Sequence, residues 1–232
     1  MTFSKKNIWI TGASSGIGKA VAEAMAREKA NLILSGRKET AQQVLSTFEK
    51  IDGLYHFGGV SQRSFVVETP LEVDRKIFEV NYFGTIALTK AVLPRMIETG
   101  GGQIAVTSSI VGKFGFPYRS AYSASKHALH GFFESLRAEN KSNKIRVSLI
   151  IPGRIQTNIS VNALNKDGAS HGKMDEGQQK GKTAEASAKI ICRKLKKEKK
   201  EILVGGKELL MVYIRRFFPS LYYYMSSKVK PL

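Results

Sequence analysis

The chain has 232 residues, of which 42% are hydrophobic, and its formal net charge is +18. This composition is typical of a folded globular protein and excludes extended disorder. The single cysteine, Cys192, excludes an internal disulfide framework and a cluster of thiolate metal ligands. His127 and His130 share a predicted helix face but have no acidic or cysteine partner nearby, so we expect no metal.

The positive charge is concentrated at the end of the chain, where 12 Lys and Arg stand against 3 Asp and Glu from Lys189 onward. Such a tail favours an acidic partner such as lipid headgroups or nucleic acid, although solvated charge is the commoner explanation. Nucleic acid is the weaker candidate because no recognition motif accompanies the charge. No apolar leader precedes the first apolar segment, and no stretch of 18 apolar residues occurs. We therefore expect a cytoplasmic protein.

Short runs rich in β-branched residues alternate with amphipathic stretches of helix length. The runs are 7–11, 31–35, 53–57, 103–108, 145–151 and 201–205. This alternation predicts a doubly wound α/β fold, with a parallel sheet covered by helices on both faces. The sequence "TPLE", Thr69 to Glu72, predicts a helix start with a threonine cap. We expect one domain over 1–206, a lid loop at 158–182 and a basic, aromatic tail at 207–232.

The first run leads directly into the sequence "TGASSGIG" and then a predicted helix. Glycines there allow a tight turn and the close approach of a pyrophosphate to the helix N-terminus. The predicted dinucleotide contacts in this turn are Gly12, Ser14, Ser15, Gly16, Ile17 and Gly18. After the second run, Gly36 occupies the position where a carboxylate would bind the ribose 2′-hydroxyl, and Arg37 and Lys38 follow. These cations favour NADP over NAD.

Tyr122 and Lys126 are four residues apart, which places both side chains on one face of a helix. An ammonium beside a phenol favours the phenolate and lowers the pKa of the tyrosine, so this pair could transfer a proton near neutral pH. Ser109 lies at the end of the 103–108 run, and ligands bind at strand ends in open parallel sheets. Taken singly, each of these residues is also suited to packing or capping.

Five segments together are similar to a known family. "TGASSGIG", "NYFG", "TSS", "YSASK" and "IPGRIQT" occur in the order and spacing of the short-chain dehydrogenases/reductases, and the resemblance covers nearly the whole chain. It implies a Rossmann-like NADP-dependent oxidoreductase that interconverts a ketone and a secondary alcohol. The residues that the resemblance implies as catalytic are Asn81, Ser109, Tyr122 and Lys126.

The resemblance also implies a role for each of these residues. Tyr122 would be the general acid and base, and Ser109 would donate a hydrogen bond to the substrate oxygen. Lys126 would depress the pKa of Tyr122 and bind the nicotinamide ribose, and Asn81 would hold a water in the proton relay. The residues that would line the nicotinamide are Pro152, Gly153 and Thr157. Family members commonly pair through the helices that carry Asn81 and Tyr122, which implies a homodimer or homotetramer.

The chain departs from the family between Arg37 and Ile51, where only 13 residues intervene. The family normally places a helix, a third strand and another helix there. We therefore expect six strands in the order 2-1-4-5-6-7 by the family's numbering, with the third edge strand missing and one helix over 39–52. Loss of the adenine contacts at that strand predicts weak cofactor binding, or dimer contacts that cover the exposed area.

Two single residues and the tail also depart from the common pattern. His56 replaces an asparagine and is expected to hydrogen bond in a structural role, whereas Arg154 could face an acidic substrate group or solvent. The apolar and aromatic tail could lie in a membrane interface, or it could close over the substrate cleft or pack on the core. It resembles the tails of a family branch that sits on membrane surfaces, which predicts a lipophilic carbonyl substrate. The alternative function is a catalytically weak dinucleotide-binding sensor, scaffold or membrane-associated module.

Overall fold

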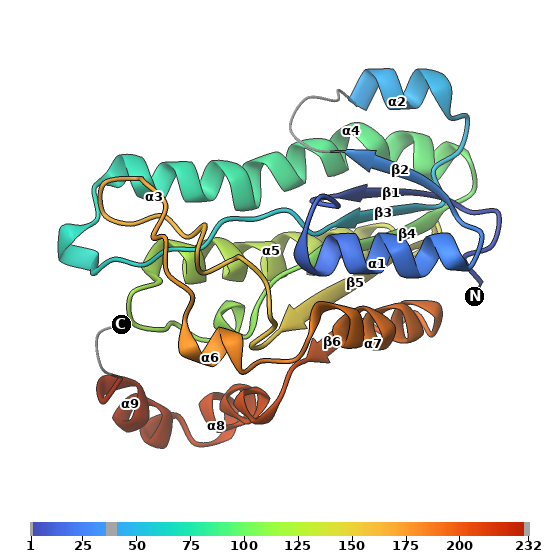
Figure 1. Cartoon of the computed structure of the whole chain (residues 1–232). Helices are drawn as coiled ribbons and strands as arrows, with labels where there is room; N and C mark the ends of the chain where they lie inside the picture. Colours follow the sequence, from blue (N-terminus) through green and yellow to red (C-terminus); the bar gives the residue numbers. More distant parts are fainter. Residues whose placement is uncertain (1, 36–40, 230–232) are drawn as a thin grey trace.

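The computed structural model describes residues 2–35 and 41–229, and these form one parallel sheet (Figure 1). Its strands are β1 (Asn7–Thr11), β2 (Asn31–Ser35), β3 (Gly53–His56), β4 (Gly102–Thr107), β5 (Ile145–Pro152) and β6 (Glu201–Val204). Their order across the sheet is β2-β1-β3-β4-β5-β6, and every neighbouring pair is parallel. This order equals 2-1-4-5-6-7 in the family's numbering. The predicted α/β Rossmann-like fold is thus confirmed.

Helices cover both faces of the sheet (Figure 1). On one face α1 (Gly16–Arg27) packs beside α7 (Ala184–Lys196). On the other lie α2 (Ala41–Thr47), α4 (Gly84–Glu98) and α5 (Ser120–Glu139), whose apolar side chains share one core cluster. The short helix α3 (Leu71–Phe78) continues into α4 through a five-residue π-helix, Glu79–Phe83.

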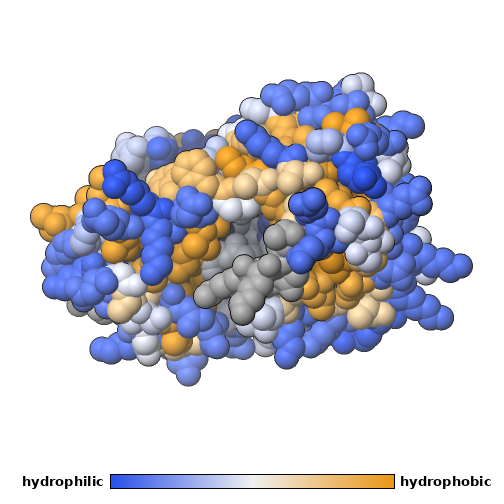
Figure 2. All heavy atoms as spheres, turned by 90° about the horizontal axis from the view of Figure 1, so that it is seen from above, coloured by the Kyte–Doolittle hydropathy of each residue, from blue (hydrophilic) through white to orange (hydrophobic). Residues whose placement is uncertain are grey.

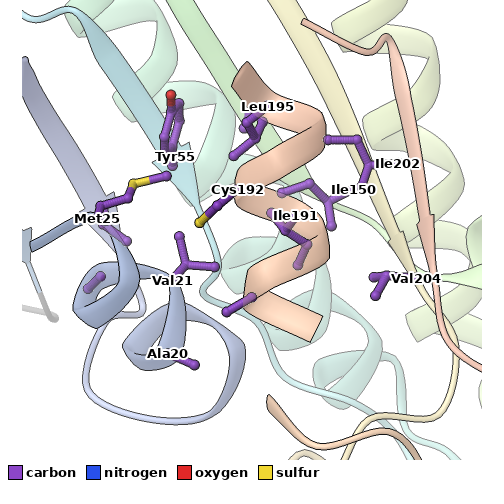
Figure 3. Close-up of a cluster of buried hydrophobic side chains, with 14 of the residues drawn as sticks. Ala20, Val21, Met25, Tyr55, Ile150, Ile191, Cys192, Leu195, Ile202 and Val204 are labelled. Carbon is purple, nitrogen blue, oxygen red and sulfur yellow. The ribbon is translucent and has the colours of Figure 1, made fainter. Parts of the chain in front are cut away.

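The alternation of side chains along β1 divides the core into two clusters. Ile8 and Ile10 join the cluster with α1 and α7, whereas Trp9 joins the cluster with α4 and α5. Successive residues of a strand point to opposite faces of the sheet, so the five residues of β1 contribute side chains to both core clusters. Figure 3 shows the first cluster, in which Cys192 on α7 faces side chains of α1 and the strands. Burial raises the pKa of the Cys192 thiol to about 12.

A buried polar chain crosses the middle of the sheet. The Tyr55 hydroxyl on β3 donates to Gln103 Oε1 on β4 at 2.7 Å, and Gln103 Nε2 donates to the Leu195 carbonyl at 3.0 Å. Gln103 is 0% exposed, so an unpaired amide there would lose hydrogen bonds with water that nothing replaces. These hydrogen bonds therefore connect the central strands β3 and β4 to α7.

The shortened connection runs from β2 to β3 at the edge of the sheet. Helix α2 ends at Thr47, earlier than the expected 39–52 helix, because the chain must turn back toward β3. Just before β3, the Asp52 carboxylate accepts a hydrogen bond from the Asn7 backbone N–H at 3.0 Å.

Seen from above, apolar patches lie among hydrophilic side chains (Figure 2), and Leu34 on β2 is 51% exposed. Gly36, Arg37 and Lys38 lie outside the described residues.

The predicted threonine cap is wrong. Helix α3 begins at Leu71 with Pro70 as its N-cap residue and without a side-chain cap. The Thr69 hydroxyl instead donates to the Phe65 carbonyl at 2.7 Å, since the preceding residues form a 3₁₀ turn that leaves this acceptor within reach.

After β6, the chain forms α8 (Leu210–Phe217) and α9 (Pro219–Ser227), which lie at the end of the sheet where β5 and β6 finish (Figure 1). Tyr222 is buried against Val111 and Phe114, and its hydroxyl donates to the Gly115 carbonyl. Within residues 2–35 and 41–229, no helix has the length and apolar content needed to cross a membrane.

Candidate active site

The turn after β1 is built for close approach of backbone to backbone. Gly12 and Gly16 have positive φ angles of 68° and 55°, which L side chains rarely adopt. A Cβ at Gly12 would lie 2.5 Å from the Gly58 nitrogen, and one at Gly18 would lie 2.3 Å from the Gly12 oxygen. Helix α1 starts at Gly16 without a side-chain cap and with no acidic residue in its first turn. The turn therefore fits a phosphate group.

A single cleft of about 1280 Å³ runs from this turn along the carboxyl ends of the strands. It brings together most of the residues that the sequence pointed to. Those lining it are Gly12, Ser14, Ser15, Gly16, Ile17, Gly18, Ser109, Tyr122, Lys126, Pro152, Gly153 and Thr157. Arg37 lies outside the described residues. The cleft joins the phosphate turn to the proton-transfer residues and so fits an extended dinucleotide.

Tyr122 stands in the first turn of α5 and lines the cleft together with Ser109. Ser109 is the N-cap residue of a 3₁₀ turn after β4, so a strand end and a helix start converge on one point. Burial raises the pKa of Tyr122, whereas the nearby Ser109 hydroxyl and the charges of Arg119 and Arg63 lower it. The net direction is upward, opposite to the direction expected from a lysine neighbour.

Lys126 lies one turn after Tyr122, with its Nζ 5.8 Å from the centre of the tyrosine ring. The Nζ donates to the Thr107 carbonyl at 2.8 Å. Burial lowers the pKa of Lys126 to about 8, so the side chain remains mostly charged at neutral pH. Its carbonyl partner fixes the ammonium at the end of β4, inside the cleft.

Asn81 is fully buried in the π-helix and does not line the cleft. Its Oδ1 accepts the Val60 N–H at 2.8 Å, and its Nδ2 donates to the Val60 carbonyl at 2.9 Å and to Ser125 Oγ at 3.0 Å. A Cβ at Gly59 would come within 3.1 Å of Asn81 Oδ1 and 3.2 Å of Lys126 Nζ. Asn81 thus holds the segment after β3 against α5.

Sequence reasoning missed a buried charge cluster beside Tyr122. Arg63 makes two hydrogen bonds to the Asp175 carboxylate, with Nε 3.2 Å from Oδ1, and Arg119 Nη2 lies 3.0 Å from Oδ2. Burial and the charge of Arg63 lower the pKa of Arg119 to about 10. Burial alone would raise the pKa of Asp175, but the bond and charge of Arg63, together with Arg119, lower it.

The charge cluster fixes the predicted lid loop over the cleft. Asp175 belongs to the 158–182 connection, whereas Arg63 follows β3, so the pair joins segments 112 residues apart. The same connection pairs with the body of the fold through the bridges Gln62↔Leu164 and Ile155↔Lys182. No sequence pattern signals an ion pair across such a distance. The polar residues that follow β3, among them Arg63, were the only sequence feature that pointed to this cluster.

The structure shows the contacts of His56 and Arg154, the two single residues that depart from the common pattern of the family. His56 Nε2 lies 3.0 Å from Thr89 Oγ1, and burial lowers the pKa of His56 to about 3, so the ring is neutral and structural. Arg154 is exposed and also lines the cleft, with its guanidinium against Gly177. The expected hydrogen-bonding role of His56 fits this geometry.

The histidines on α5 are engaged by the protein itself. His127 Nδ1 lies 2.8 Å from the Ser123 carbonyl, and His130 Nε2 lies 2.9 Å from Ser108 Oγ. Among the described residues, His130, Glu134 and Glu201 bring potential ligand atoms within 4.8 Å of one another. Both carboxylates are exposed, and Glu201 is bound by Lys113 at 2.5 Å, which opposes a cation there.

The tail contributes to one wall of the cleft. Met211 lines it, and Met211, Val212 and Ile214 of α8 pack in one cluster with Tyr122. The inner face of the tail therefore covers part of the cleft, which was one of the expectations for this segment. The outer face carries exposed Phe217, Phe218 and other aromatic side chains.

Comparisons with known proteins agree with this geometry. A family model described as "short chain dehydrogenase" matches residues 6–49 and 35–168. A relative from Xenopus laevis, "Dehydrogenase/reductase SDR family member 7B", is 36% identical over 261 aligned positions. The alignment covers 95% of this chain and 81% of the relative. The alignment exceeds the 232 residues of this chain, so it contains positions that the chain lacks. The two family matches overlap at 35–49, where the chain is shortened.

Solved structures share the fold. A short-chain dehydrogenase from Burkholderia cenocepacia in complex with NADP has a TM-score of 0.83 at 21% identity, covering 99% of this chain and 100% of the other. A short-chain dehydrogenase/reductase from Burkholderia phymatum in complex with NAD has a TM-score of 0.81 at 22% identity, covering 100% and 99%. One was solved with NADP and the other with NAD, so the likeness leaves the cofactor preference open.

We predict that Asp175→Asn releases the lid loop. The change leaves Arg63 buried without its carboxylate, and breaking a buried pair costs about 3–5 kcal/mol. Trypsin should then cut at Lys166 and Lys173 about tenfold faster or more than in the unchanged protein. Cleavage is followed by mass spectrometry.

Glu176→Gln is the matched control, because its carboxylate is exposed and paired only with Lys180 one turn away. It should leave the cleavage rate unchanged. Equal rates in both variants would show that Asp175 does not hold the loop.

Proposed function

This chain belongs to the short-chain dehydrogenase/reductase family, and we propose that it reduces a lipophilic ketone to a secondary alcohol with NADPH. The family establishes an NAD(P)-dependent oxidoreductase. The observation that carries the proposal is one cleft that brings Tyr122 and Ser109 together with the glycine turn and Lys126. We propose Tyr122, Ser109 and Lys126 as the catalytic set, with Asn81 as the buried member that joins α5 to the segment after β3.

The chain's own residues can handle the proton and the charge of the reaction. When bound, the nicotinamide cofactor supplies the hydride. Ser109 would donate a hydrogen bond to the substrate carbonyl oxygen, which draws electron density from the carbon. Tyr122 then gives its proton to the developing alkoxide, and its raised pKa means that it is protonated at neutral pH. Lys126, Pro152, Gly153 and Thr157 would hold the cofactor.

A lipophilic substrate is favoured by the wall of the cleft beyond Tyr122. The apolar side chains lining it there are Ile110, Val111, Phe114, Phe116 and Met211. An apolar wall binds hydrocarbon by removing it from water, whereas it offers no partner to sugar hydroxyls.

A homo-oligomer is supported by apolar surface on the helix that carries Asn81. Val80 and Phe83 in the π-helix are about half exposed, and Val80 also borders the cleft. Apolar groups exposed together favour a protein contact. We therefore retain the homodimer or homotetramer as a proposal.

Replacing the general acid tests catalysis. In Tyr122→Phe, ketone reduction should fall by about 10²–10⁴-fold in kcat, because the proton donor is removed. NADPH absorbance is followed with a panel of apolar ketones. Tyr213→Phe, which removes a hydroxyl from a half-exposed ring on α8, should keep the unchanged rate. A variant as fast as the unchanged protein on every ketone would instead favour a sensor or scaffold function.

Cofactor preference tests the cations after β2. Arg37 and Lys38 would attract the 2′-phosphate of NADP and do nothing for NAD. We expect NADP to bind about tenfold or more tightly than NAD by titration calorimetry, and Arg37→Gln to remove most of that difference. If NAD binds equally or more tightly in the unchanged protein, the assignment is wrong. A weak absolute affinity for both would agree with the shortened adenine end.

Membrane contact tests the outer face of the tail. Phe217 and Phe218 are 64% and 63% exposed, and Arg215 and Arg216 precede them. Aromatic rings beside cations favour an anionic lipid surface. The double variant Phe217→Ser/Phe218→Ser should lose co-sedimentation with phosphatidylserine vesicles, whereas Val66→Ser/Val67→Ser, also on exposed residues, should retain it. No co-sedimentation of the unchanged protein would remove this contact.

A further inference from the structure

Gln62 is a fully buried polar residue that none of the sequence motifs singled out. It lies in the segment 60–64, which leaves the carboxyl end of β3 and passes beside the start of α5. Its side chain points at that helix start rather than at solvent. Burying an amide costs free energy unless its donors and acceptor are all paired, so its partners show what it does there.

The oxygen of the Gln62 amide caps the catalytic helix. Oε1 accepts the Ala121 N–H at 2.9 Å and the Tyr122 N–H at 3.3 Å, both in the first turn of α5. The N-cap residue of α5 is Arg119, whose side chain provides no cap. First-turn N–H groups have no partner within their own helix, so Gln62 supplies from another segment what a local serine or aspartate usually supplies.

The nitrogen of the amide is fixed by three hydroxyl groups. Nε2 lies 3.2 Å from Ser64 Oγ, 3.2 Å from Thr69 Oγ1 and 3.3 Å from Ser120 Oγ. Backbone N–H groups can only donate, so the oxygen must face Ala121 and Tyr122, and the amide has one orientation. Gln62 is therefore held from both ends.

The backbone around Gln62 is joined to two other parts of the site. The Leu164 N–H donates to the Ser61 carbonyl at 2.9 Å, and the Arg63 N–H donates to the Leu164 carbonyl at 2.8 Å, which attaches the lid loop. Asn81 binds both backbone groups of Val60. The position of Tyr122 is thus linked through one short segment to Asn81 and to the lid.

We propose that Gln62 is a positioning residue that holds Tyr122 in place for proton transfer while bringing no charge to it, a role that rests on the proposed reduction. A glutamate would offer the same oxygen to the two N–H groups but would bring a negative charge to the first turn of α5, which carries the phenol. That charge would oppose formation of the phenolate. The neutral amide gives the cap without this penalty.

Other charged and titratable groups also surround Tyr122. Arg119 and Lys126 belong to α5, and Arg63 and Asp175 form the ion pair between the β3 segment and the lid. Tyr222 of α9 joins the apolar cluster around Tyr122. These groups are unchanged in Gln62 variants, so a shift in the titration of Tyr122 reports the change at position 62.

The test compares Gln62→Met, which has no cap, with Gln62→Glu, which keeps the acceptor. Ketone reduction by Gln62→Met should lose about 10–100-fold in kcat while the KM for NADPH stays within about twofold. Gln62→Glu should recover most of kcat. Reduction uses the protonated phenol, so activity is lost as pH rises through the pKa of Tyr122. A raised pKa in Gln62→Glu should move this alkaline limb upward by about one pH unit.

Gln103→Met is the matched control, because Gln103 is equally buried and its two side-chain hydrogen bonds are also lost, but it lies in the sheet core away from the cleft. It should lower stability without changing kcat or the alkaline limb. If Gln62→Met keeps the unchanged kcat, or if Gln103→Met shows the same loss as Gln62→Met, the positioning role is wrong while the reductase function stands.

A second readout does not depend on turnover. In protein labelled with ¹³Cζ-tyrosine, the Tyr122 signal, assigned through Tyr122→Phe, should titrate at higher pH in Gln62→Glu than in the unchanged protein. If the unchanged protein reduces no ketone of the panel, the proposed function fails and this titration decides the role of Gln62 alone. An unshifted titration overturns the proposal, even if Gln62→Met is too unstable to study.

Discussion

The site depends on the pairing of β1 with β3. Their parallel register, from Ile8↔Gly53 to Thr11↔His56, brings the two strand ends to the same edge of the sheet. The turn after β1 then lies against Gly58, and the segment after β3 passes Asn81, α5 and the lid loop. A side chain at Gly12 would separate these loops. The phosphate turn and the proton-transfer residues therefore share one cleft because two backbones can touch there.

The missing edge strand does not disturb this pairing. In the family's arrangement that strand would lie outside β2, on the far side of β1 from β3. Its loss exposes part of β2, including half of Leu34, at the edge of the sheet away from β4 and Ser109. The contacts that are expected to be lost are those to the adenine end of the cofactor, which the family resemblance places at that edge.

Residues with local or periodic signals could be predicted from sequence. The strands were found because β-branched runs mark buried parallel strands, and their ends agree within one residue. Tyr122, Lys126 and Ser109 were found through spacing. Gln62 and Asp175 were missed because their partners lie far along the chain, and polar residues after a strand look like an ordinary loop. The direction of the Tyr122 pKa was also missed, since burial is a property of the whole fold.

The only cysteine of the chain has a practical consequence. Cys192 is buried between α1 and α7, and its raised pKa leaves almost no thiolate at neutral pH. Alkylating reagents and mild oxidants react with thiolates, so the natural protein should be silent toward them. A cysteine placed on the outer face of α8 or on the lid loop would then be the single reactive thiol. A fluorescent or spin label could report on either segment without first removing Cys192 from the core.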